Sequence, residues 1–127
     1  MFENFKAINL TIGFPSVSIT KNGITFNKAS LIKLSYPSHV KLMMDDMNHQ
    51  MAIQICKGDD EYASAFIRNN RRPSYARWNN RDLIATISDM MTWNLEENGR
   101  KVTGKYIDDE KALLFELDKA EIIGKEE

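Results

Sequence analysis

Short runs in which apolar and polar residues alternate dominate the first half of this 127-residue chain. Two such runs, 17–20 and 24–26, flank the dipeptide Asn22-Gly23, and this arrangement is the strongest short-range signal for a β-hairpin. Two further runs, 40–44 and 51–55, flank a polar stretch and predict a second hairpin. Because hairpins pair antiparallel strands, these patterns limit the chain to a mainly β or α+β fold.

The remaining strands are expected to be short as well. We expect them at 5–11, at 63–68, at 75–78, and in a C-terminal hairpin made by 101–107 and 112–117 around an acidic turn. The tail that follows contains a short apolar element and an acidic end.

Two helices are expected, each with an asparagine cap. Asn27 can cap a short helix from Lys28 to Leu34, and Asn79 or Asn80 can cap a longer one that runs to about Trp93. The longer helix carries an apolar stripe formed by Leu83, Ile84, Ile87, Met90 and Met91. We therefore expect one α+β, mainly β domain over 1–127, with antiparallel hairpins, one short helix and one longer amphipathic helix. Within it, 79–122 would form the longer helix and the C-terminal hairpin.

Charge is distributed unevenly along the chain, although the net charge is only −1. Residues 1–61 carry six basic and six acidic side chains, residues 62–81 carry five arginines and no acid, and residues 82–127 carry six basic and twelve acidic side chains. Arginine is the cation suited to bidentate recognition of phosphate, so this clustering marks 62–81 as a candidate binding segment.

The arginine segment also contains flat aromatic rings and amides. Tyrosine and tryptophan can stack on a nucleobase, asparagine can bond ring edges or ribose hydroxyls, and a helix N-terminus attracts anions. The candidate ligand-binding residues are Arg68, Arg71, Arg72, Tyr75, Arg77, Trp78, Asn80 and Arg81. The alternative is a solvated basic loop that pairs with the acidic C-terminal third, within the chain or across a subunit contact.

No motif for catalysis, a metal or a cofactor is found. His39 and His49 lack metal-ligand spacing, and no base is placed by motif to activate Cys56. The acidic clusters lie in expected turns and lack the spacing of a calcium loop, and the six glycines are scattered. We therefore expect a protein that is not an enzyme.

Location and assembly are suggested by simpler features. No apolar run approaches the roughly 18 residues of a membrane span, no secretory signal is evident, and a single cysteine fits a reduced, cytoplasmic setting. Met43 and Met44 are neighbours in an expected strand and so face opposite sides of the sheet. Since one of them needs cover, we expect a homo-oligomer; the alternative is a strand buried on both sides within one chain.

Residues 23–56 read as a glycine, a short strand, a short helix ending in leucine, and a hairpin with an acidic turn: GITFNKASLIKL, then SYPSHVKLMMDD, then MAIQIC. This order resembles the swapped-hairpin DNA-binding module of the AbrB/MazE type. The resemblance implies a DNA-binding transcriptional regulator. The family carries arginines around its first strand and helix, whereas this chain has Lys21, Lys28 and Lys33 there.

A second resemblance rests on overall character, since the chain is rich in lysine, asparagine and isoleucine. It looks like small proteins of phages and prophages of low-GC bacteria, among them the anti-Thoeris sponges. Those proteins are small oligomers that bind cyclic ADP-ribose-type signals without cleaving them. The leading hypothesis is therefore a sponge that sequesters a small phosphorylated nucleotide. The alternatives are the AbrB-like regulator, with DNA as its partner, and a prophage protein that binds a host protein.

Overall fold

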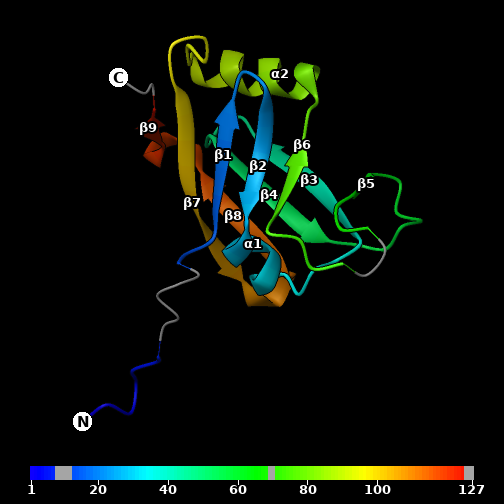
Figure 1. Cartoon of the computed structure of the whole chain (residues 1–127), viewed down its shortest axis with the longest axis vertical. Coiled ribbons are helices and arrows are strands. Elements are labelled where there is room, and N and C mark those ends of the chain that lie inside the picture. The colour runs from blue at the N-terminus through cyan, green and yellow to red at the C-terminus, as the bar shows by residue number, and fades with distance from the viewer. Residues whose placement is uncertain (8–12, 69–70, 125–127) are drawn as a thin grey trace.

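The computed structural model describes residues 1–7, 13–68 and 71–124, and in that part of the chain nine strands form an antiparallel sheet accompanied by two α-helices (Figure 1). The strands are β1 (Ser16–Thr20), β2 (Gly23–Asn27), β3 (His39–Asp45), β4 (Gln50–Ile55), β5 (Ala63–Ala65), β6 (Tyr75–Trp78), β7 (Gly99–Ile107), β8 (Ala112–Glu116) and β9 (Glu121–Ile123). The helices are α1 (Lys28–Lys33) and α2 (Arg81–Met91). The expected α+β, mainly β class is confirmed.

β7 joins the two halves of the sheet. The strand order is β5-β3-β4-β8-β7-β1-β2-β6, and β9 also pairs with β7. The first part of β7, from Arg100 to Thr103, pairs with β1, and the part from Gly104 to Ile107 pairs with β8. Gly104 stands where the strand passes from one half to the other, and a Cβ there would lie 2.7 Å from the buried Phe115 ring. The missing side chain therefore makes room for that ring.

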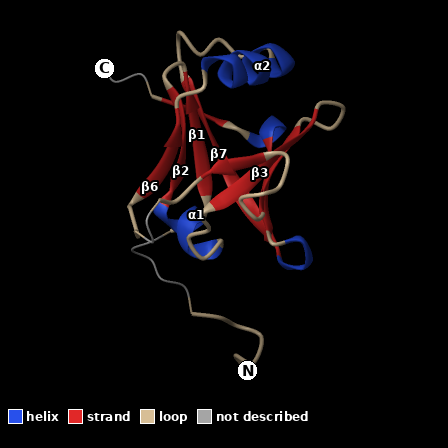
Figure 2. Ribbon diagram, turned by 90° about the vertical axis from the view of Figure 1, so that its right-hand side faces the viewer, coloured by secondary structure: helices blue, strands red, loops and turns tan. Residues whose placement is uncertain are grey.

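The sheet curls, so that its two edge strands, β5 and β6, face each other. The Trp78 indole Nε1–H donates a hydrogen bond to the Ala65 carbonyl oxygen at 3.1 Å, which links the two edges. Behind it, Phe26, Phe66 and Trp78 make edge-to-face contacts with centroid distances of 5.2–6.0 Å. We call this line between β5 and β6 the seam. α2 lies over one end of the curled sheet and α1 at the other (Figure 2).

Both expected helices are confirmed, with their asparagine caps. The Asn27 side chain accepts from the Ser30 backbone N–H, and the Asn80 side chain accepts from the Leu83 backbone N–H, each at 3.0 Å. α2 ends at Met91, two residues before the expected end, because Thr92 takes a left-handed conformation with φ of 56°. Ile84 and Ile87 are the buried residues of α2.

The first hairpin differs from its expected form by one residue. β1 and β2 pair through Thr20 and Gly23, so Lys21 and Asn22 form the turn and Gly23 opens the second strand. A Cβ at Gly23 would lie 2.5 Å from the Arg77 guanidinium carbon, since β6 is the other neighbour of β2. The Arg77 guanidinium therefore lies directly over Gly23, which has no side chain there.

Other sequence predictions differ in extent. The strand expected at 63–68 covers only Ala63–Ala65, since the next two backbone N–H groups bond to the carbonyls of Ser38 and Pro37 instead. Residues 5–7 form no strand, and the rest of the segment expected at 5–11 lies outside the described residues. The second hairpin and the C-terminal hairpin are confirmed as β3–β4 and β7–β8. Neither described helix is long and apolar enough to cross a membrane.

Candidate functional site

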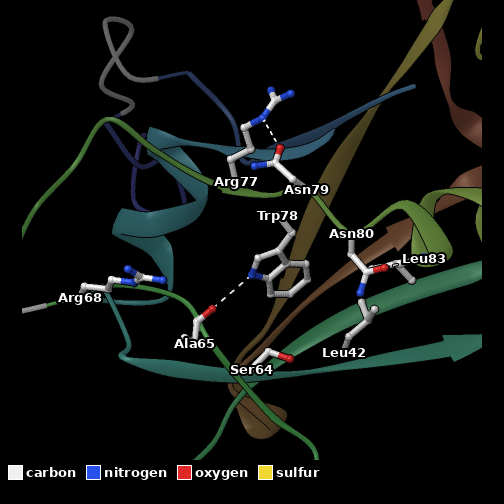
Figure 3. A pocket seen from close by; sticks show the side chains of 9 residues that line it. All are labelled: Leu42, Ser64, Ala65, Arg68, Arg77, Trp78, Asn79, Asn80 and Leu83. Carbon is white, nitrogen blue, oxygen red and sulfur yellow. Dashed lines mark hydrogen bonds between the residues drawn. The ribbon is translucent and has the colours of Figure 1, made fainter. Parts of the chain in front are cut away.

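A pocket of about 540 Å³ opens at the seam beside the N-terminus of α2 (Figure 3). Its size lies within the usual range of small-molecule sites. It is lined by β3, both edge strands, the residue Arg68 after β5, the loop before α2 and the first turn of α2. The lining residues are Leu42, Ser64, Ala65, Arg68, Arg77, Trp78, Asn79, Asn80 and Leu83.

Trp78 forms the wall of the pocket that faces the core. Its indole Nε1–H is already bonded to Ala65, and its ring packs against Phe26 and Phe66. These contacts hold the half-buried indole in one orientation, so a planar group can stack on it without first ordering the side chain. Leu42 and Leu83 add apolar surface on the side of α2.

The two asparagines of the pocket have their oxygens engaged within the fold. Asn80 Oδ1 accepts the Leu83 N–H, and Asn79 Oδ1 accepts the Arg77 Nε–H at 2.8 Å. The amide nitrogens remain as donors, and that of Asn80 points toward Leu42 in Figure 3. With the Ser64 hydroxyl, the pocket thus offers groups that can donate hydrogen bonds to a ligand rich in acceptors.

Arg68 and Arg77 contribute differently to the pocket. The Arg77 side chain lies over Gly23, and its NH1 donates to Thr25 Oγ1 at 3.2 Å, on the opposite side of the strand from Trp78. Arg68 is exposed, and among the described residues no hydrogen bond or ion pair engages its guanidinium. No acidic side chain lines the pocket. Arg68 is therefore the cation available to an anion bound there.

The structure brings together four of the eight candidate residues: Arg68, Arg77, Trp78 and Asn80. Arg72 lies elsewhere, with its guanidinium 5.1 Å from the centre of the Tyr36 ring, in a hollow next to α1. Arg81 lines a third hollow, between α2 and the β1–β2 turn. Tyr75 and Arg71 are exposed and do not line the seam pocket.

The pairing of the arginine segment with the acidic C-terminal third is not found within the described residues. Their ion pairs involve lysines, His49 and the N-terminal amine, and none involves an arginine.

Five lining residues were absent from the sequence-based set. Asn79 had a signal, since it lies within the arginine segment and was considered as a helix cap. Ser64 and Ala65 also lie within 62–81 but carry no charge or ring that would mark them. Leu42 and Leu83 come from β3 and α2, and the curl of the sheet and the position of α2 bring them to Trp78. Their inclusion depends on strand order, which short-range patterns do not report.

Metal-ligating side chains and the cysteine outside the pocket are further candidate reactive groups. Within the described ranges, no three His, Cys, Asp or Glu side chains gather as a metal site would require. Burial raises the pKa of the Cys56 thiol, and the negative charge of Asp60 raises it further. A raised pKa lowers the thiolate fraction at neutral pH, which is the opposite of what a nucleophilic cysteine needs.

Comparison with protein-family models, with curated proteins and with solved structures finds no match to this chain.

Proposed function

We propose that this chain is a non-enzymatic binding protein that holds a small phosphorylated nucleotide, linear or cyclic, in the seam pocket. The observation that carries the proposal is the chemistry of the lining. Among the described residues no bond engages the Arg68 guanidinium, and it lines one pocket with the Trp78 indole, the Asn80 amide and the Ser64 hydroxyl, with no acid in the lining. Phosphate oxygens and the acceptor atoms of a base match such donors, and a base matches the indole.

The proposal assigns the residues distinct roles. Arg68 binds phosphate through its forked donors, Trp78 stacks on the base, and Asn80 donates to an acceptor on the base or ribose. Arg77 acts on the rim, where its bond to Asn79 fixes that amide. No metal or cofactor is needed for these roles.

Binding without turnover suits a sponge that sequesters a defence signal, encoded by a phage or prophage and acting in the cytoplasm of its host. The support is the donor-rich lining of the seam pocket, which suits binding. A serine–histidine contact, Ser38 Oγ with His39 Nδ1 at 3.0 Å, lies outside that pocket. Sequestration requires only tight binding and enough protein to deplete the free ligand.

The test is a thermal melt of the full chain with cyclic and linear nucleotides, from monophosphates to ADP-ribose. A ligand that binds only the folded state stabilises it by about 2.7 kcal/mol at a hundredfold excess over Kd, which raises the Tm by several degrees. Arg68→Ala should remove most of that shift, because a hydrogen bond to a charged group contributes about 1.5–3 kcal/mol. Arg68→Lys should restore it only in part, since an ammonium lacks the fork.

Arg71→Ala is the matched control, because Arg71 is an exposed arginine three residues away that does not line the pocket. It should keep the full shift. Recovery of the ligand intact, measured by mass spectrometry, distinguishes a sponge from a hydrolase. If no nucleotide shifts the Tm and duplex DNA is retarded on a gel and released by moderate salt, the AbrB-like regulator replaces this proposal.

A further inference from the structure

The outer face of the second half of the sheet carries an apolar stripe. Met43, Ala52 and Leu114 are paired in register across β3, β4 and β8, so their side chains lie side by side on the face away from the core. Met43 is 39% exposed, and Ala52 and Leu114 are half-buried. The solvent face of an antiparallel sheet is usually polar, so this stripe is an exception to the alternation around it.

A hollow of about 160 Å³ lies in this stripe and is shaped by those three residues with the adjacent parts of β3 and β4. An apolar cavity of about 150 Å³ holds a molecule the size of benzene. The hollow is thus too small for a nucleotide and suits one large apolar side chain of another protein.

The same hairpin presents a matching side chain. Met47 lies in the β3–β4 turn and is 91% exposed. The turn is held by the Asp45 carboxylate, which accepts from the backbone N–H groups of Met47 and Asn48 at 3.1 Å and from Asn48 Nδ2 at 2.8 Å. Met47 is therefore a projecting apolar side chain on an ordered turn.

An opposite pair of charges lies beside these two features, and the Asp45 carboxylate, which holds the turn, also lines the hollow. Lys105 is exposed and pairs in register with Leu114, next to the hollow. Asp46 is exposed and precedes Met47 in the turn. Among the described residues, neither Lys105 nor Asp46 takes part in an ion pair. If the β3–β4 turn of another copy entered the hollow, its Asp46 would lie close to Lys105.

We infer that a second copy of this chain docks on the stripe in a two-fold dimer, with Met47 of each copy inserted in the hollow of the other and Asp46 beside Lys105. A two-fold contact uses the same patch on both copies, and here the projecting side chain and the hollow lie on one patch. Both Met47 side chains and both hollows are covered at once. The seam pocket is not part of this surface, so the inference does not depend on the proposed function.

The test is the mass of the full chain in solution, measured by light scattering and by analytical ultracentrifugation at micromolar concentration. The wild type should have twice the chain mass of 14.6 kDa. Met47→Asp should be monomeric and Met47→Leu dimeric. Because Met47 is almost fully exposed, neither change should disturb the fold, which circular dichroism checks.

Charge exchange tests the orientation of the two copies. Lys105→Glu should raise the dimer dissociation constant at least tenfold, and adding Asp46→Lys should recover most of the loss. A wild type of single-chain mass up to near-millimolar concentration overturns the inference. So does a Met47→Asp variant that stays dimeric, or a mass above the dimer, since a two-fold contact closes at two copies.

Discussion

Hydrogen bonds within the fold decide which polar atoms of the seam pocket are left to bind a ligand. An asparagine can accept and donate, but capping α2 engages the oxygen of Asn80, and Arg77 engages that of Asn79. The indole N–H, which is the one side-chain donor of Trp78, is likewise bonded to the Ala65 carbonyl oxygen. What remains for a ligand is a set of donors around an indole face. Helix capping and strand packing thus determine which ligand chemistry the pocket can satisfy.

Asp45 gives a residue-scale prediction about pH. The hydrogen bonds from Asn48 and Met47 lower the pKa of its carboxyl from the ordinary value of 3.8. A pKa lower in the folded state contributes stability above the unfolded value, and this contribution is lost as the pH falls through the folded one. Asp45→Ala should therefore lower the Tm at neutral pH, and its difference from wild type should shrink well below pH 3.8. Thermal melts across that range check this; a difference independent of pH would contradict it.

Half of the sequence-based site residues line one pocket because they lie close together in the chain. Arg68, Trp78 and Asn80 fall within thirteen residues, and the curl of the sheet, which brings β5 to β6, closes this short segment on itself. Residue type alone could not separate Arg68 from Arg72, whose guanidinium lies on Tyr36 instead. That difference depends on packing against α1, which follows from tertiary structure.

Secondary elements were predictable where the signal was local. Alternation and polar turns located both early hairpins, and asparagine caps located both helices. The sequence-based boundaries were wrong where pairing with a distant part of the chain sets them. The turn between β1 and β2 lies one residue earlier than expected, and Gly23 is a strand residue beneath Arg77. β5 stopped at Ala65 because the following backbone groups bond to the loop before β3.

α2 is predicted to be held by its buried face rather than by its intrinsic helix propensity. Ile87 is fully buried in the core cluster, so Ile87→Asp places an unpaired charge there at a cost of several kcal/mol. This loss is comparable to the total stability of a small domain, about 5–15 kcal/mol. We expect Ile87→Asp to be unfolded or insoluble by circular dichroism. The matched control is Ala85→Asp, on the exposed side of the same helix, which should melt within a few degrees of wild type.

The whole molecule depends on one strand, because β7 belongs to both halves of the sheet. Strand order of this kind is set by pairings between distant parts of the chain. β8 lies between β4 and β7, and β1 lies between β7 and β2, which no local pattern in the sequence specifies. A strand shared in this way should make the two halves unfold together.

Gly104→Ala tests that coupling. The added Cβ would lie 2.7 Å from the Phe115 ring, which is fully buried and cannot move away. Overpacking of this kind destabilises by about 1–3 kcal/mol, so the urea midpoint should fall. Because β7 serves both halves, tryptophan fluorescence, circular dichroism and hydrogen exchange in β1 and β4 should still report one transition. Gly58→Ala is the control, since Gly58 lies outside the sheet and the atoms nearest its Cβ would be those of the partly exposed His39 ring, at 3.1–3.4 Å. If β1 and β4 exchanged at different urea concentrations, the two halves would be independent units and β7 would not couple them.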